Sequence, residues 1–280
     1  SQLRFAARSG PAGRERRIKS TCFQTIAPTP WAQMIEIIGL KKSFKGMPVL
    51  TGLDLTIQDD ETMAVIGPSG CGKSVLLKHL VGLLRPDEGK IIIDGEDITR
   101  YSDSKLYDLR EKFGMLFQSA ALFDSLSVGE NVGLWLKEHT KTPETEIAVK
   151  ADRILNLVGL RDVMEKRPSE LSGGMKKRVG LARAIINEPE YVLYDEPTTG
   201  LDPIMSDIIN DLIIKVRTEL KNTAIVVTHD MASVYKVADR IAMMHQGKIV
   251  FLGKPEDIKT TDNPLAQQFI QGKAQGPIRL

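Results

Sequence analysis

The chain has 280 residues, 42% of them hydrophobic and 26% charged, which is ordinary for a folded protein and excludes a disordered chain or a fibrous repeat. The net charge of +2 gives no indication of nucleic-acid binding, and no apolar run approaches the roughly 18 residues of a membrane-spanning helix. With only Cys22 and Cys71, a fold held together by disulfides is also excluded.

The first 33 residues differ from the rest in composition. They are rich in Arg, Ser, Thr and Pro, contain Glu15 as their only acidic residue, and show neither a helical nor a strand period. Such a segment favours a disordered or non-native N-terminal arm, and it loosely resembles an organelle transit peptide. A strand-like pattern begins at Met34, so we expect the folded body to start there.

Strands and helices alternate from residue 34 onward. Three of the predicted strands are continuous apolar runs, which is typical of strands buried on both faces of a parallel sheet. The sequence therefore predicts an α/β fold whose sheet is covered by helices on both faces. The predicted strands are Thr62–Ile66, Lys90–Ile93, Tyr191–Tyr194, Ala224–Thr228, Arg240–Met244 and Lys248–Leu252.

The first of these strands leads directly into a glycine-rich loop. The loop matches the pattern G-x-x-x-x-G-K-[ST], and a helical segment starting at Val75 follows it. The loop residues are Gly67, Pro68, Ser69, Gly70, Cys71, Gly72, Lys73 and Ser74. Glycines let backbone N–H groups converge on a phosphate, Lys73 supplies a positive charge for the β- and γ-phosphates, and the Ser74 hydroxyl can bind Mg²⁺. The sequence predicts a nucleotide site here, in preference to a plain glycine-rich turn.

Between residues 119 and 190 the pattern is helical and poor in strands. The segment Thr145–Val158 carries apolar residues at helical spacing and is followed by Gly159, a residue type common at helix ends. We therefore expect a helical insertion into the α/β core, over about residues 119–185.

A second potential anion site lies at Leu171-Ser172-Gly173-Gly174-Met175. Ser172 is a natural N-cap for the helix that follows, and a helix start rich in glycine offers backbone N–H donors and the positive end of a helix dipole. One glycine-rich loop already binds one side of a triphosphate. The second site is therefore expected to close over a nucleotide held by another molecule.

Two carboxylates follow the buried strand at Tyr191–Tyr194. Asp195 is expected at the carboxyl edge of the sheet, where it can hold Mg²⁺ through water. Glu196 is one residue further along an extended chain, so it is expected to point the other way and to polarise an attacking water. A pair of solvated loop acids is the alternative.

These motifs together resemble the ATPase subunits of ABC transporters, over about residues 34–260. The signature of that family is Leu-Ser-Gly-Gly, found here at Leu171–Gly174. The resemblance implies a P-loop NTPase core with a mostly parallel sheet, an antiparallel β subdomain and an inserted helical subdomain. It also implies ATP hydrolysis with Mg²⁺ in a head-to-tail homodimer, in which each phosphate loop faces the partner's Leu171–Met175 segment.

The resemblance assigns roles to four further residues. Gln118 stands where the family has a glutamine that contacts Mg²⁺ and the hydrolytic water. His229 matches a histidine that binds the γ-phosphate and holds Glu196. Asp202 matches a loop that contacts the partner subunit. Phe44 stands where an aromatic ring stacks on adenine, although the family more often has Tyr; an ordinary core phenylalanine is the alternative.

Several details resemble the Mla and Mce group of these ATPases, which move phospholipids or related lipids between membranes. They are the Ser74-Val75 pair, the Met175-Lys176-Lys177 segment and the tail at residues 261–280, which in that group reaches the partner ATPase. The resemblance implies transmembrane permease subunits, a Mce-domain lipid-binding subunit and no nucleic acid. It implies the cytoplasmic face of the inner membrane, with the stromal side of a plastid membrane as the alternative.

Other functions share some of these motifs. A DNA-repair or chromosome-structuring ATPase would carry a long coiled coil between its phosphate loop and the acidic pair, and a translation ATPase would carry two cassettes. A nonhydrolysing regulator would lack Glu196 or His229, both of which are present. An importer of amino acids or ions and a lipoprotein-releasing system stay open as alternatives to lipid transport.

Overall fold

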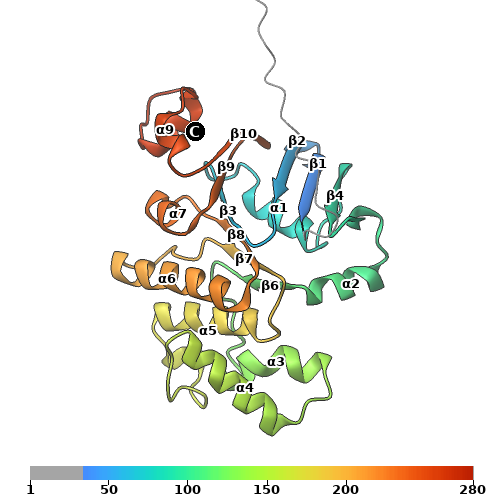
Figure 1. Cartoon of the computed structure of the whole chain (residues 1–280), viewed down its shortest axis with the longest axis vertical. Coiled ribbons are helices and arrows are strands. Elements are labelled where there is room, and N and C mark those ends of the chain that lie inside the picture. The colour runs from blue at the N-terminus through green and yellow to red at the C-terminus, as the bar shows by residue number, and fades with distance from the viewer. Residues whose placement is uncertain (1–33, 280) are drawn as a thin grey trace, which may run out of the picture. The chain divides into compact units, whose positions relative to one another are not determined.

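The structure is a computed structural model that describes residues 34–279, so the predicted N-terminal arm at residues 1–33 lies outside it. A four-stranded antiparallel sheet in the order β2-β1-β4-β5 starts the described chain (Figure 1). Its strands are β1 (Ile35–Phe44), β2 (Met47–Ile57), β4 (Glu88–Ile93) and β5 (Glu96–Asp97). This sheet is the predicted antiparallel β subdomain.

The second sheet has six strands in the order β10-β9-β3-β8-β7-β6. Its strands are β3 (Thr62–Ile66), β6 (Phe113–Leu116), β7 (Tyr191–Asp195), β8 (Thr223–Val227), β9 (Arg240–His245) and β10 (Lys248–Gly253). All neighbouring pairs are parallel except β9 with β10. The prediction of a mostly parallel sheet is confirmed. Five of its strands have bounds within one residue of the predicted ones, whereas β6 was not among the predicted strands.

The helices described in residues 34–279 are α1 (Lys73–Leu80), α2 (Asp103–Glu111), α3 (Val128–His139), α4 (Glu144–Leu157), α5 (Gly173–Ile185), α6 (Pro203–Leu220), α7 (Met231–Val237), α8 (Asp257–Thr260) and α9 (Pro264–Ile270), with short 3₁₀ turns η1 (Ile98–Arg100) and η2 (Pro168–Glu170). Seven of these α-helices lie between strands, and α8 and α9 follow the last strand.

The two faces of the six-stranded sheet belong to different hydrophobic clusters. Along β7, Leu193 packs with Leu76 and Leu77 of α1, whereas its neighbours Val192 and Tyr194 pack with α5 and α6 on the other face. Both sets are fully buried. Successive side chains of a strand point to opposite faces, so a sheet covered on both faces requires the continuous apolar runs seen in the sequence.

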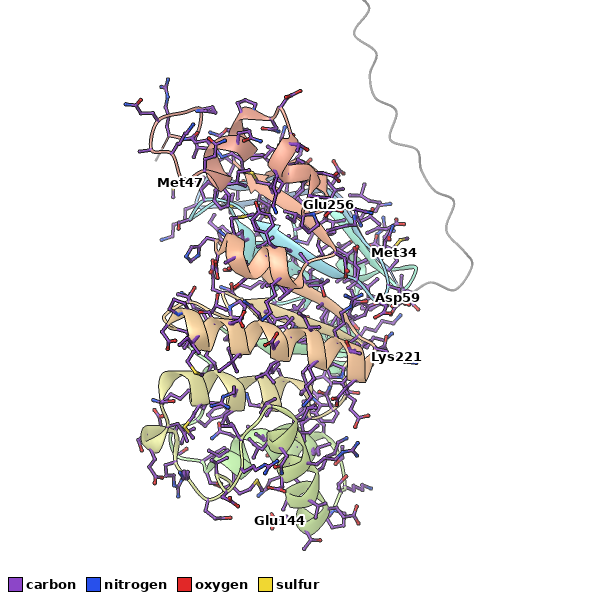
Figure 2. The ribbon with its side chains drawn as sticks, turned by 60° about the vertical axis from the view of Figure 1, so that its left-hand side comes forward. Met34, Met47, Asp59, Glu144, Lys221 and Glu256 are labelled. Atoms are coloured by element: carbon purple, nitrogen blue, oxygen red, sulfur yellow. The ribbon has the colours of Figure 1, made fainter. Side chains whose placement is uncertain are left out.

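The helical insertion consists of α3, α4 and the first part of α5, which pack on one another (Figure 1). Ser127 and Glu130 form a reciprocal capping box that starts α3. The observed α4, Glu144–Leu157, is displaced by one residue from the predicted helix. Figure 2 shows Glu144 at the end of this block farthest from the sheets.

The C-terminal tail packs on its own chain. Ala266 of α9 and Ile278 are buried in a cluster with Ile66 and Val234. The Gln268 side chain accepts a hydrogen bond from the Ile278 N–H at 2.7 Å and donates one to the Ile278 carbonyl at 3.1 Å. These bonds fold the last residues back against α9.

Candidate functional site

The phosphate loop connects β3 to α1, as the sequence predicts. Gly67 has φ 147°, and a Cβ added there would lie 2.2 Å from the carbonyl oxygen of Met244, on β9. Gly72, at φ 108°, precedes the first helical residue. A side chain at position 67 would clash with the Met244 carbonyl, and a residue other than glycine at position 72 would be strained by its positive φ. Both glycines are buried, so the two ends of the loop pack closely on neighbouring segments, while Ser69 and Gly70 between them are exposed.

Lys73 lies inside this loop. Its ammonium donates hydrogen bonds to the carbonyl oxygens of Gly67 at 2.7 Å and Pro68 at 3.1 Å, and the residue is 8% exposed. Charged phosphate oxygens are stronger acceptors than neutral carbonyls. The amine can therefore turn to a bound phosphate with little movement. Beside it Cys71 is buried, and burial raises the pKa of its thiol.

Ser74 and Asp195 meet across the loop. The Ser74 hydroxyl donates to Oδ1 of Asp195 at 3.1 Å, joining the start of α1 to the end of β7. Burial raises the pKa of Asp195, and the hydrogen bond from Ser74 opposes this rise. A hydroxyl and a carboxylate at this distance form the oxygen-donor set that Mg²⁺ prefers, so the residues present fit the predicted metal.

Glu196 differs from the prediction in its backbone. It has φ 51°, so the chain makes a left-handed turn directly after β7 and is not extended. Its N–H donates to Val227 of β8 at 2.9 Å, and its carboxylate accepts from the hydroxyl of Thr199 at 3.0 Å. A non-glycine residue in this conformation costs on the order of 1–3 kcal/mol and needs surrounding contacts to hold it.

His229 lies beside Glu196. Its Nδ1 is 2.8 Å from Oε2 of Glu196, and the imidazole is 62% exposed while the glutamate side chain is 14% exposed. The ring follows the end of β8, which is next to β7 in the sheet. Asp195 and Glu196 thus leave one strand toward different partners, the phosphate loop and the histidine.

Gln118 and Phe44 are both exposed to solvent. Gln118 is exposed two residues beyond the end of β6, and within residues 34–279 its side chain makes no hydrogen bond. Phe44 ends β1 and is 38% exposed, with the Lys42 ammonium 5.7 Å from its ring centroid. Phe44 is therefore not a core residue, and its ring is free to stack on a ligand.

The Leu171–Met175 segment forms the start of α5. Ser172 is the N-cap, and its hydroxyl accepts from the Met175 N–H at 3.3 Å. Leu171 and Gly174 are buried, whereas Ser172 and Gly173 are exposed. α5 packs on the face of the sheet opposite α1. Its exposed donors are thus available to a group outside this chain.

Two features of the site were not predicted from the sequence. Asp202, assigned to a partner contact, also caps α6, since its Oδ1 accepts from the N–H groups of Ile204 and Met205 at 3.0 Å. Lys177 of α5 is buried and donates to the carbonyl oxygen of Glu196 at 3.1 Å. The helical spacing of Lys177 with buried Gly174 and Leu181 is the signal that could have found it.

None of the helices formed by residues 34–279 combines the length and the apolar character needed to cross a bilayer.

Comparisons with known proteins show which family the chain resembles. A family model described as ABC transporter matches residues 50–199. A probable ribonucleotide transport ATP-binding protein of Mycobacterium tuberculosis is 43% identical over 89% of this chain and 69% of its own length. An intermembrane phospholipid transport system ATP-binding protein of Haemophilus influenzae is 39% identical over 88% of this chain and 93% of its own length. A chloroplastic Arabidopsis thaliana protein named trigalactosyldiacylglycerol 3 is 44% identical, over 88% and 76%.

Solved structures give the same result. A dimeric ATP-binding cassette in a post-hydrolysis state, bound to ADP and Pi, superimposes with a TM-score of 0.74 at 30% identity, over 79% of this chain and 98% of that one. A cassette from Clostridium perfringens that is part of an ABC transporter complex gives a TM-score of 0.76 at 32% identity, over 83% and 92%. The chain therefore belongs to the ABC transporter family, as an ATP-hydrolysing subunit.

Proposed function

We propose that two copies of this chain bind two ATP molecules between them and use their hydrolysis to drive membrane permease subunits that move phospholipids between membranes. The observation that carries the hydrolytic part is the divergence of Asp195 toward Ser74 and of Glu196 toward His229. The similarity to a phospholipid transport ATPase over nearly its whole length supports the cargo.

ATP binding requires groups for the phosphates and for the base. Lys73 would exchange its carbonyl partners for phosphate oxygens, while the N–H groups at the start of α1 bind the same phosphates. The exposed ring of Phe44 would stack on adenine. Val75 continues α1 and holds the loop's end in helical geometry.

Ser74, Asp195 and Gln118 would hold Mg²⁺. When bound, the ion neutralises negative charge on the β- and γ-phosphate oxygens. The Ser74–Asp195 contact sets two of these side chains before any ion binds. Gln118 follows β6, the neighbour of β7, and its exposed side chain is free to turn toward the same edge.

Glu196 would act as the general base. It takes a proton from the attacking water, whose oxygen bonds to the γ-phosphorus while the bond to the bridging oxygen of ADP breaks. His229 contacts the acceptor oxygen Oε2 and keeps the carboxylate directed away from Asp195. When both ring nitrogens carry a proton, the free Nε2 of this exposed imidazole can donate to the γ-phosphate from the same position.

The second half of each site would come from the partner subunit. Ser172 and Gly173 present donors to the outside of this chain, and a related cassette is dimeric with ADP and Pi bound. A head-to-tail pair places these donors on the nucleotide held by the other phosphate loop. Closure excludes water and strengthens each charge interaction.

Permease subunits would dock in a groove between the core and the helical block. This groove, of about 490 Å³, is lined by Met115, Phe117, Phe123, Leu134 and Trp135 among others. Phe117 and Phe123 are 39% and 52% exposed, so a partner helix would bury aromatic surface there. Phe117 directly precedes Gln118 in the chain, so a movement of Phe117 on permease docking would also move the proposed Mg²⁺ ligand Gln118.

The tail would contact the partner ATPase near the loop that contains Gly200, Leu201 and Asp202, which is expected to contact the partner as well. Phe269 and Ile270 line one groove together with Gly200, Leu201 and His229. Asp202 follows directly in this loop and caps the helix that carries its exposed neighbour Ile204. A partner seated there would cover apolar residues from both the tail and the loop.

We place the complex at the inner membrane, with the ATPase at the cytoplasmic face and a Mce-domain subunit carrying lipid. A stromal location at a plastid membrane is the alternative, supported by the relative named chloroplastic. A ribonucleotide cargo is a second candidate, favoured by the name of the mycobacterial relatives.

The test is purification of the complex with its permease from the native membrane. Mass spectrometry identifies the bound small molecules, and a second assay measures ATP-driven transfer of labelled phospholipid between vesicles. Bound phospholipid and transfer that stops in a Glu196→Gln complex are expected. Bound ribonucleotide or amino acid without lipid transfer would overturn the cargo.

A further inference from the structure

Lys177 is a cation buried beneath the catalytic turn. It is 5% exposed, although lysine is almost never fully buried without a partner. Its ammonium donates to a neutral acceptor, the carbonyl oxygen of Glu196 at 3.1 Å. Burial lowers the pKa of Lys177, and the carboxylates of Glu196 and Asp195 oppose this shift. Burying this charge is unfavourable, which indicates that the hydrogen bond to the Glu196 carbonyl has a specific role.

The contact is with a strained turn. Glu196 has φ 51°, and its carbonyl also accepts from the Thr199 N–H at 3.3 Å, a long bond. Together with the bond from the Glu196 N–H to Val227, the Lys177 bond fixes both peptide groups that flank this residue. The direction of these peptides sets the direction of the Glu196 carboxylate toward His229.

The same helix carries the signature segment. Lys177 lies five residues after Ser172, about 7.5 Å along the axis of α5. A helix shifts as a rigid element, so a displacement at its first turn reaches Lys177. In the dimer proposed above, Ser172 faces the partner's nucleotide, whereas Glu196 serves the nucleotide on its own phosphate loop.

We propose that Lys177 is a positioning residue that holds the Glu196 turn from α5 and thereby links the two ATP sites of the dimer. When Ser172 binds the partner's nucleotide it fixes the position of α5. Through its hydrogen bond, Lys177 then fixes the position of Glu196, the general base for the nucleotide on its own chain's phosphate loop. The inference rests on the proposed function, because it needs Glu196 to be the base and the dimer to be head to tail.

The experiment compares Lys177→Met, which keeps the length and loses the donor, with Lys177→Arg, which keeps the charge and the donor. Lys248→Met, an exposed lysine on β10, is the matched control. Steady-state ATP hydrolysis by the full chain gives kcat, KM and the Hill coefficient for ATP. Thermal unfolding and Glu196→Gln are measured in parallel.

For Lys177→Met we expect kcat to fall on the order of 10²-fold, as for a misplaced catalytic group, with KM unchanged within twofold. We also expect its Hill coefficient to fall to 1 from a higher value in the unmodified chain and in Lys248→Met. Lys177→Arg should recover most of kcat and of the cooperativity.

Three results would overturn the inference: an unchanged kcat in Lys177→Met, an unchanged Hill coefficient, or equal losses in both Lys177 variants together with a lower unfolding temperature, which would indicate packing alone. If Glu196→Gln itself keeps normal turnover, the proposed function fails, and that outcome is distinct from an active Lys177→Met beside an inactive Glu196→Gln.

Discussion

The phosphate-loop half and the signature half of the site differ in how far one chain completes them. In the first half Lys73 binds two carbonyls, Ser74 binds Asp195, and Glu196 lies against His229. In the second half Ser172 caps only its own helix and is exposed with Gly173. One half is organised before any ligand binds, and the other offers donors to a second molecule.

The largest effect is expected from Glu196→Gln, in the organised half. Loss of the proton acceptor should lower turnover about 10³-fold, since general-base catalysis contributes roughly 10²–10⁴-fold. ATP should still bind, because the phosphate loop is untouched, and the dimer should stay closed. Size-exclusion chromatography with ATP and Mg²⁺ detects the closed form. Turnover at the rate of the unmodified chain would remove Glu196 from the base role.

Lys73→Ala tests the same half at the binding step. Removing a charged donor from phosphate oxygens should weaken ATP affinity on the order of 10²-fold or more. Equilibrium binding of a fluorescent ATP analogue measures it, with Lys78→Ala, an exposed residue of the same helix, as the control. Near-normal affinity in Lys73→Ala would show that the loop does not bind phosphate.

Ser172→Asp tests the half that faces outward. Asp is as good an N-cap as Ser, so α5 keeps its cap while a negative charge faces the partner's triphosphate. Turnover should fall about 10²-fold, as for loss of a donor in a charge-stabilising site, without loss of thermal stability or of ATP affinity in the monomer. The neutral cap Ser172→Asn is the matched control and should retain most activity. Full turnover in Ser172→Asp would exclude a phosphate near this segment.

Phe44→Ala should have a smaller effect. Stacking of a base on an aromatic ring contributes about 1–3 kcal/mol, so the affinity for ATP should fall roughly 5- to 150-fold, whereas Phe44→Tyr should keep it. Titration calorimetry compares the two variants. Equal affinities for Phe44→Ala and Phe44→Tyr would place the adenine elsewhere.

The smallest effect is expected at the tail. Deleting it would expose the buried cluster around Ala266 and Ile278, so substitutions of the half-buried Phe269 and Ile270 to Ser are the sharper test. They should weaken complex assembly by a few-fold and leave ATP affinity unchanged, with Gln271→Ser as the exposed control. Analytical ultracentrifugation of the purified complex measures assembly. Unchanged assembly would restrict the tail to its own chain.

The comparison also shows what a sequence can predict. Five of the six strands of the second sheet and the phosphate loop were predictable because each depends on a local pattern, an apolar run or fixed glycine spacing. The long β2 strand, Met47–Ile57, was not predicted. Its pattern mixes polar and apolar residues, and its strand conformation depends on pairing with β1.

The conformation of Glu196 could not be predicted for a related reason. Two acids after a strand indicate an extended chain, but the left-handed turn is held by Val227 and Lys177, which are distant in sequence. The pairing of Ser74 with Asp195 likewise arises from a sheet edge that brings separate segments together. Long-range contacts decide the direction of a catalytic side chain, whereas local pattern decides only its presence.

The central claim is that each ATP site combines one chain's phosphate loop with the other chain's signature segment. Mixing Lys73→Ala with Ser172→Asp tests it most directly, because a mixed head-to-tail dimer contains one site with an intact loop and an intact signature. ATP hydrolysis should rise on mixing equal amounts, above the sum of the two separate variants. It should stay below the roughly one quarter of the unmodified rate that random pairing of independent sites would give, because Glu196 of the intact site belongs to the chain whose own Ser172 is changed. A mixture no more active than the sum of the two separate variants would contradict the account.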